Sequence, residues 1–333
     1  ATPAPDGLPG SERGCVIAAG EITESVTLTN DTFWFANGRV YVGNQDTADG
    51  TDNEGITLTV EPGTRMIWGA DGNPDAALFV QMGAQLVAEG TATAPIVMAG
   101  PDIADNVDAG GQTWGGLIVH GRAPVNVCDG IGCAENEVDS SLYGGDDAND
   151  DSGVIKYVRI QNAGGDIDQD PERQYNGAAF HGVGRSTVVE YVQVHDNRDD
   201  AFEWFGGTVN GRFLVATYMG DDGLDWVQGW QGRVQHALVV RNPDIGAPAS
   251  EDPRLIEGDG LSSNNLATPL STPWISNVTF IGNGIDDGLV IRRGSGVKLT
   301  NSIVDCGGVG NGIQLRDAAT YDLASNATGD LTI

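Results

Sequence analysis

Short runs of β-branched and other apolar residues alternate with glycine, asparagine and aspartate along the whole chain. The runs are too short for ordinary helices, and their apolar positions follow a period of two rather than 3.6. The glycine, asparagine and aspartate residues between them are typical of turns. We therefore predict an all-β fold with no helix, even at the termini. Clear examples of the runs are Ile56–Val60, Leu117–Val119, Val188–Val194, His236–Val240, Val278–Ile281 and Val297–Thr300.

A triplet of Asn or Asp, then Gly or Ala, then an apolar residue recurs in the second half of the chain. It starts at Asn176, Asp200, Asp222, Asp259, Asp287 and Asn311. Most intervals are 22 to 28 residues, and the single interval of 37 contains a Pro-rich insertion. Such a period, with β-branched strands and no leucine-rich pattern, predicts one coil of a right-handed parallel β-helix per repeat. Asn and Asp suit the corners because both tolerate left-handed backbone geometry.

Alternation within each repeat divides the residues after the corner into inward and outward rows. The pairs Phe202 with Trp204 and Leu224 with Trp226 are expected to stack inside the coil. Two outward rows follow from the same alternation. The first comprises Ala179, Glu203, Asp225, Ser262, Val290 and Gln314, and the second comprises His181, Phe205, Val227, Asn264, Arg292 and Arg316.

The chain shows no linker-like segment, so we predict one domain. Residues 1–20 are expected to be a loose N-terminal segment and residues 21–333 a single β-helix. Turn-rich insertions near 139–151, 166–172 and 241–257 are expected to leave the solenoid as loops. No apolar run reaches the ~18 residues of a transmembrane segment. The first residues lack the features of an intact signal peptide, so they are either the start of a processed, exported protein or an arbitrary boundary.

Acidic residues dominate the charge of the chain. There are 47 acidic and 17 basic residues, which gives a formal net charge of −30. A surface of this sign repels nucleic acid and anionic membranes, and it attracts divalent cations. The composition therefore argues against nucleic-acid and lipid partners. It fits a secreted or cell-surface protein in a salty or calcium-containing medium.

Two of the four cysteines, Cys128 and Cys133, enclose a short glycine-containing loop. We predict a local disulfide between them, which is typical of an oxidising compartment. A zinc half-site is the alternative, but no second Cys/His pair follows at ligand spacing. Cys15 and Cys306 are expected to lie on the order of 45 Å apart, about ten coils. They fit buried thiols, a chain that continues past residue 333, or head-to-tail filaments of the protein.

Some stretches are more specific than the general repeat. They are Leu58–Arg65, Gly90–Val97, Trp114–Asn126, Ser152–Arg159 and Asn176–Gly229. In these stretches, across roughly residues 55 to 242, the chain resembles the bacterial exported β-helix surface proteins, often known only as lipoproteins or hypothetical proteins. The resemblance implies export and a β-helix, and it implies no settled activity and no catalytic residues. Cys15 lies too far into the chain to be a lipidated first residue.

Doubled acids occupy successive predicted corners, at Asp199–Asp200, Asp221–Asp222 and Asp286–Asp287. Neighbouring coils stack about 4.8 Å apart. Two carboxylates at that separation repel by roughly 3 kcal/mol at an effective dielectric constant of about 20. Calcium would offset this repulsion, because it takes many oxygen ligands in loose geometry. The alternative is that these residues are solvated and serve only the turn.

Two acidic loops are further candidates for calcium. One contains Asp146, Asp147, Asp150 and Asp151, and the other contains Asp166, Asp168 and Asp170. The second begins like an EF-hand loop. It fails that motif because Pro171 stands where the sharp-turn glycine belongs and no glutamate closes the loop.

The outward rows supply a candidate catalytic set of His181, Glu203 and Asp225 on three consecutive coils. Paired carboxylates can hydrolyse glycosidic bonds. A base beside calcium and an arginine, such as Arg292, would suit elimination from a uronate. Phe205 and Trp230 are candidate platforms for sugar rings.

The plainer interpretation of each of these residues is structural, and the chain lacks Gly-x-Ser-x-Gly, a Walker loop and His-Glu-x-x-His. We therefore predict a non-catalytic surface protein that is stabilised by calcium. It would serve adhesion, glycan binding or surface assembly, with polysaccharide or further copies of itself as partners. The alternative is a polysaccharide lyase or glycoside hydrolase.

Overall fold

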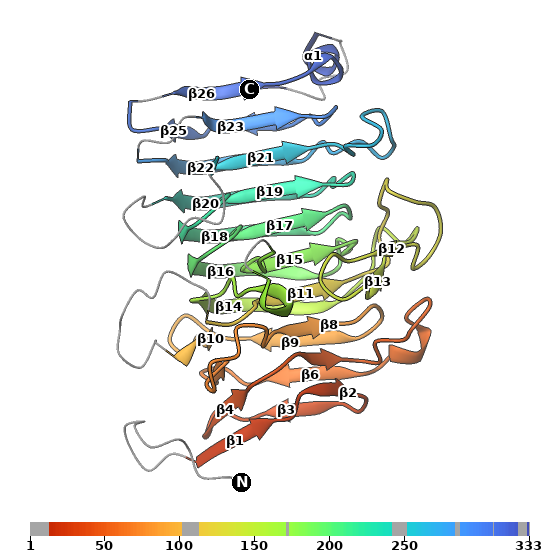
Figure 1. The fold of residues 1–333 in the computed structure, drawn as a ribbon, viewed down its shortest axis with the longest axis vertical. Coiled ribbons are helices and arrows are strands. Elements are labelled where there is room, and N and C mark those ends of the chain that lie inside the picture. Colours follow the sequence, from red (N-terminus) through yellow and green to blue (C-terminus); the bar gives the residue numbers. More distant parts are fainter. Residues whose placement is uncertain are drawn as a thin grey trace.

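The fold is a tall stack of coils, in which two long sheets of parallel strands run the length of the molecule (Figure 1). The structure is a computed structural model and describes residues 13–101, 113–170, 173–241, 252–283, 287–308, 310–325 and 332. Coil follows coil in chain order, from the red N-terminal end to the blue C-terminal end. This arrangement confirms the predicted parallel β-helix.

One wall of the helix is a ten-stranded parallel sheet with one strand per coil. Its strands, in spatial order, are β2 (Gly20–Ile22), β5 (Val40–Val42), β8 (Leu78–Val80), β11 (Leu117–His120), β15 (Ala178–His181), β17 (Phe202–Phe205), β19 (Leu224–Val227), β21 (Ile256–Asp259), β23 (Asp287–Arg292) and β26 (Asn311–Leu315).

The other walls belong to a 14-stranded sheet that bends around a corner. The early coils contribute separate short strands on the two sides of the bend, and the middle coils contribute one long strand that crosses it. The short strands are β1 (Arg13–Ile17), β3 (Val26–Leu28), β4 (Thr32–Ala36), β6 (Thr57–Val60), β7 (Arg65–Trp68), β9 (Gln85–Glu89) and β10 (Ile96–Ala99). The later strands are β14 (Gly153–Gln161), β16 (Val188–Asn197), β18 (Asn210–Met219), β20 (Arg233–Val240), β22 (Trp274–Ile281), β24 (Lys298–Thr300) and β25 (Ile303–Asp305).

A column of residues with left-handed backbone forms this bend. Tyr157, Tyr191, Phe213, His236 and Asn277 have φ angles between 49° and 61°. Each interrupts the pairing of its long strand, which resumes on the other side. The rings of Tyr157, Tyr191 and Phe213 stack with centroids 4.4 Å apart. Stacking of successive corner residues thus holds the bend in the same place from coil to coil.

Inward-facing apolar side chains fill the coil in continuous columns, as predicted. The register places Leu224 and Trp226 of β19 over Phe202 and Trp204 of β17, and all four are fully buried. Trp204 also stacks on Trp230, with ring centroids 4.3 Å apart. A fully buried large apolar side chain contributes roughly 1.5–3 kcal/mol. These buried columns therefore contribute much of the stability of the β-helix, and they hold the strands that carry the outward-facing residues.

The predicted outward rows hold except in one coil, where the register needs correction. Strand β21 pairs Ile256 with Leu224 on one side and Leu289 on the other. The corner residue of this coil is therefore Arg254 rather than Asp259. Glu257 and Asp259 consequently take the outward places predicted for Ser262 and Asn264. The triplet that begins at Asp259 copies the repeat, but it starts at the last residue of β21 instead of preceding the strand.

The insertions differ in extent from the prediction. The first is longer than 139–151: residues 121–152 leave the stack between β11 and β14 and carry the hairpin of β12 (Ala134–Glu135) and β13 (Leu142–Tyr143). We call residues 121–152 the disulfide loop. The second insertion contains the short 3-10 turn Ile167–Gln169, and a similar turn spans Thr51–Asn53.

Parts of the other predicted segments fall outside what the structure describes. In the third insertion, residues 242–251 lie outside the described residues, and the predicted range overlaps the start of β21. The predicted corner acid Asp286 and residues 171–172 of the second insertion also lie outside them.

Two expectations about the ends of the chain are corrected. The N-terminal segment is not loose as far as residue 20, because Arg13–Ile17 form β1, which pairs with β4. A helix, α1 (Ala318–Ser325), lies at the C-terminal end of the stack, where none was predicted (Figure 1). Its Thr320 is fully buried and accepts a hydrogen bond from the Gly294 amide. Local contact with the last coils therefore supports a helix that has little amphipathic pattern of its own.

Candidate functional site

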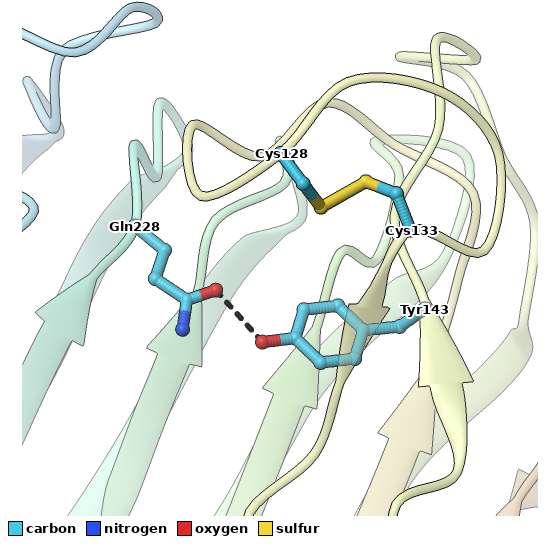
Figure 2. Close-up of a disulfide and its surroundings, with 4 residues drawn as sticks. All are labelled: Cys128, Cys133, Tyr143 and Gln228. Carbon is cyan, nitrogen blue, oxygen red and sulfur yellow. Dashed lines mark hydrogen bonds between the residues drawn. A yellow bond between two sulfur atoms is a disulfide. The ribbon is translucent and has the colours of Figure 1, made fainter.

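The disulfide loop folds back over the outer face of the ten-stranded sheet. Cys128 and Cys133 form the predicted disulfide, with Cα atoms 5.9 Å apart. Figure 2 shows the ring of Tyr143 below this disulfide, with its hydroxyl directed at Gln228. The hydroxyl donates to Oε1 of Gln228 at 2.7 Å, which ties the loop to the coil of β19. The loop therefore seals the part of the outward rows that lies beneath it.

His181, the first candidate catalytic residue, lies in this sealed region. Its imidazole is 1% exposed and stacks on Phe205 with ring centroids 4.1 Å apart. Neither ring nitrogen has a hydrogen-bond partner among the described residues. Burial lowers the pKa of His181 well below its usual value, and the neighbouring His120 adds to this effect. His181 is thus a neutral packing residue, which the surrounding residues shield from solvent.

Glu203 and Asp225 lie on β17 and β19, and Glu203 is close enough to the disulfide loop that the charge of Glu137 acts on it. The register pairs Glu203 with Asp225 and Asp225 with Glu257 of β21. Strand alternation turns all three side chains outward, because they sit between inward-facing core residues. The row predicted from sequence therefore continues through a third acid, Glu257, at the place predicted for Ser262.

The corner acids approach this row from one side. Asp199 and Asp200 precede β17, and Asp221 and Asp222 precede β19. One carboxylate oxygen from each member of three trios lies within 4.8 Å of the others in its trio. The trios are Asp199 with Asp200 and Asp221, Asp200 with Glu203 and Asp225, and Asp222 with Asp225 and Glu257. We call these seven residues the acidic cluster.

Burial and mutual repulsion raise the pKa values of six residues of the acidic cluster, Asp199, Asp200, Glu203, Asp222, Asp225 and Glu257. Burial is the largest cause for Asp199, whose pKa rises to about 8, and the charge of Asp221 adds to it. The pKa of Glu203 lies well above its usual range because of burial and then the charge of Asp200. The pKa values of Asp200, Asp222 and Asp225 are raised for the same two kinds of reason. Without a cation, the cluster holds protons that ordinary carboxyl groups lose.

Protein cations neutralise one edge of the cluster. Glu257 forms ion pairs with Arg254, at 2.6 Å, and with Arg292. Arg292 also contacts Asp259 at 2.8 Å. Among the described residues, no ion pair reaches Asp200, Glu203 or Asp225. The trio of Asp200, Glu203 and Asp225 is therefore the one without an ion pair, whereas Arg198 acts on Asp199 and Arg241 on Asp221 at the other edge.

Hydrogen bonds satisfy only some of the buried oxygens. The amide of Asp222 donates to Oδ1 of Asp200 at 2.8 Å, and the side-chain amide of Asn176 donates to Oε2 of Glu203. Oδ1 of Asp225 is buried and has no hydrogen-bond partner among the described residues. A buried oxygen without a partner is costly. The donor set consists of hard carboxylate oxygens, which fits calcium better than a thiophilic metal.

The two other predicted calcium loops do not converge in this way. Asp146, Asp147 and Asp151 are exposed, whereas Asp150 is buried and its pKa rises to about 6 because of burial. The second loop uses its acids in ion pairs: Asp166 with Arg198, and Asp168 with Arg39 and Arg173. Within the described ranges, no trio of metal-compatible side chains includes these residues or Asp170.

The predicted sugar-binding aromatics are covered. Phe205 is 7% exposed beneath the disulfide loop, and Trp230 is fully buried against Trp204. Arg292 is next to the acidic cluster but is held by Glu257 and Asp259. Glu257 and Arg254 are not predicted from the sequence, because the repeated triplet places the coil corner at Asp259 and the register places it at Arg254. The alternation of Ile256 and Gly258 with Glu257 and Asp259 is the signal that identifies this strand.

Comparison with known proteins identifies the family of the chain. The family model described as a pectate-lyase-like β-helix domain matches residues 20–333. The chain belongs to this family. No curated protein matches the chain. No helix in the described part of this pectate-lyase-like domain is long and apolar enough to cross a membrane.

Two solved structures, both of the catalytic domain of a GH87 α-1,3-glucanase variant in complex with tetrasaccharides, show a weak likeness to this pectate-lyase-like domain. One is 12% identical with a TM-score of 0.30, over 96% of this chain and 63% of its own. The other is 12% identical with a TM-score of 0.31, over 92% and 62%. The chain thus spans less than two thirds of the length of either glucanase chain. A likeness this weak does not bear on the activity of the chain.

Proposed function

We propose that this protein is an extracellular β-helix protein that binds calcium in its acidic cluster and uses the ion to stabilise a surface for glycan contact or adhesion. The observation that carries the proposal is the convergence of seven carboxylates, six of them with raised pKa values, on β17, β19 and β21 and the turns before β17 and β19. A divalent cation would replace the bound protons and neutralise the repulsion. The disulfide and the charge of −30 support an extracellular location.

The acidic cluster suits calcium in its number and kind of ligands. Calcium takes six to eight oxygens in flexible geometry, whereas magnesium demands near-ideal octahedral geometry and keeps its waters. Asp199, Asp221 and Asp225 are only partly buried, so an ion has access from solvent. The residues available as ligands are Asp199, Asp200, Glu203, Asp221 and Asp225, with Asp222 beside them.

Calcium titration of the full chain tests this proposal. Calcium should raise the melting temperature, because an ion that binds only the folded state adds about 2.7 kcal/mol at a hundredfold excess over Kd. Glu203→Gln and Asp225→Asn should weaken calcium binding at least tenfold in isothermal titration calorimetry. Asp146→Asn, which removes an exposed loop acid, is the matched control and should bind like wild type. Equal melting temperatures in chelator and in excess calcium would refute the proposal.

Hydrolysis of a polysaccharide is the second candidate function. The pairing of Glu203 with Asp225 favours it, because their carboxyl groups are close and the raised pKa of Glu203 suits a general acid. Incubation with a panel of acidic and neutral polysaccharides should then release new reducing ends without unsaturated products, because hydrolysis adds water across the glycosidic bond. Glu203→Gln should abolish release. If calcium-loaded protein releases no product from any of these substrates, hydrolysis is refuted and only the non-catalytic proposal remains.

A further inference from the structure

A separate groove lies on the 14-stranded sheet, away from the acidic cluster. Its volume is about 830 Å³, and the first residues of β18, β20 and β22 line it together with the turn before β16. The residues that matter here are Arg185, Arg212, Arg233, Trp274, Gln231 and Gln235. Because β18, β20 and β22 belong to successive coils, the groove runs along the axis of the stack.

The charge of this groove opposes that of the whole chain. The chain has 17 basic residues and a net charge of −30, yet three arginines and no acid line the groove. Arg185 and Arg233 form no ion pair within the described part of the chain. Arg212 contacts Glu190 at 3.4 Å, a pair that is largely exposed and therefore weak. Most of the positive charge in the groove is thus available to a ligand.

Several contacts hold these cationic side chains in place. Nε of Arg185 donates to the carbonyl of Ala148 at 3.2 Å. The guanidinium of Arg212 lies over the ring of Phe213, 5.2 Å from its centroid. The guanidinium of Arg233 lies 5.5 Å from the ring centroid of Trp274. Such contacts orient each guanidinium and lower the entropy that it loses when it binds an anion.

The rest of the lining indicates a saccharide. The indole of Trp274 is 46% exposed and donates to the hydroxyl of Thr300 at 3.2 Å. The register places Trp274 between Arg233 and Lys298, so a cationic and aromatic row continues to the next coil. Gln231 and Gln235 add amides that both donate and accept hydrogen bonds, as sugar hydroxyls require. Planar carboxylate or sulfate groups match the fork of a guanidinium.

From these features we propose that the groove binds an extended anionic saccharide that carries carboxylate or sulfate groups. Its charges are spaced by sugar rings, so a few arginines match them. Nucleic acid carries one charge per ~1.7 Å of duplex, and the excess would meet a protein of net charge −30. The site does not depend on calcium in the acidic cluster, because it lies on another sheet.

Binding assays on the full chain test this site. The probes are a hexameric glucuronate, a sulfated oligosaccharide of equal length and an uncharged gluco-oligosaccharide, measured by calorimetry at two salt concentrations. At least one anionic probe should bind, more weakly at high salt, and the uncharged probe should bind at least tenfold more weakly. Arg212→Gln, Arg233→Gln and Trp274→Ala should each reduce affinity at least fivefold.

Three controls isolate the contribution of the groove to binding. Arg159→Gln removes an exposed arginine outside the groove and should leave affinity unchanged. Glu203→Gln should also bind the probe normally, which distinguishes failure here from failure of the calcium proposal. Melting temperatures verify that every variant is folded. Equal binding of the uncharged chain, no binding of either anionic probe, or tighter binding of single-stranded DNA through the same arginines would overturn the proposal.

Discussion

Individual carboxyl groups in this protein owe their chemistry to their position on the coil. Asp146 and Glu203 are both acids on the same chain, but only Glu203 is buried beside other carboxylates. Burial disfavours its charged form, and each neighbouring acid adds to that effect. A cation would reverse both effects at once. Proton binding and the proposed calcium binding are therefore linked at the same carboxyl groups.

This linkage predicts how pH acts on the effect of calcium. Asp199 titrates near 8 in the folded state, far above an ordinary aspartate, so the folded, calcium-free protein binds more protons than the unfolded chain. Its stability should consequently fall as pH rises from about 4 towards 8. Calcium needs the ionised form, so the rise in melting temperature on calcium addition should grow over the same range.

Differential scanning calorimetry at pH 5, 6.5 and 8, with and without calcium, measures this change. The variant Asp225→Asn provides the comparison, because it should flatten the pH dependence of the calcium effect. His120 has the opposite effect on stability. Burial lowers its pKa to about 4, so between about pH 4 and 6.5 the unfolded chain binds the extra proton and stability rises with pH. The contribution of His120 is the same with and without calcium, so it cancels in the difference between the two melting temperatures. A calcium effect that is independent of pH would contradict the linkage.

How much of the site the sequence could predict depends on the residue. Asp199, Asp200, Asp221 and Asp222 were identifiable because doubled acids recur at a regular interval. Glu257 was not, because the insertion before it shifts the interval and a false triplet follows at Asp259. The burial of His181 was not predictable either, since it results from a loop that begins sixty residues earlier in the chain. The period of the sequence therefore predicts the corner acids that recur in each coil, but it does not predict which outward-facing residues an insertion buries.

At the scale of the element, the bend in the long strands depends on one stacked column. Tyr191 lies between Tyr157 and Phe213, with ring centroids 4.4 Å away on either side. The alternation in Val188–Val194 correctly predicts a strand, but alternation alone does not show that Tyr191 has a left-handed backbone, with φ of 55°. A bend is specified by neighbours on other coils, which a local pattern does not contain.

Loss of one ring should weaken this corner by a measurable amount. Each aromatic pair contributes about 0.5–1.5 kcal/mol beyond burial, so Tyr191→Ala should lower the free energy of unfolding by about 1–3 kcal/mol. Tyr191→Phe keeps both stacks and should stay within about 0.5 kcal/mol of wild type. Thermal and urea unfolding of the two variants check this. An alanine variant as stable as the phenylalanine variant would show that the column does not hold the bend.

At the scale of the whole molecule, opposite charges are sorted onto different walls. The acidic cluster lies on the ten-stranded sheet, whereas Arg185, Arg212 and Arg233 line a groove on the other sheet. A solenoid allows this separation because each wall is an independent column of residues, one per coil. If both proposals hold, the protein would bind a cation on one face and an anionic saccharide on another.

The two ends of the stack differ, and this bears on self-association. Exposed strand edges invite pairing with another chain. At the N-terminal end β1, β2 and β3 each pair with one other strand among the described residues. At the other end α1 lies beyond the last coil, and Thr332 forms a bridge with Lys298. The helix occupies part of the end that a head-to-tail filament would use.

The two free cysteines also argue against a head-to-tail filament. Cys306 is buried, and burial raises the pKa of its thiol above the usual value, which lowers its reactivity. We therefore expect the 333-residue chain to remain monomeric in multi-angle light scattering at high concentration. Cys306 should react with iodoacetamide much more slowly in the folded protein than in urea, while Cys15 serves as the internal comparison. Filaments in electron micrographs, joined by a disulfide between Cys15 of one copy and Cys306 of the next, would instead establish the head-to-tail assembly.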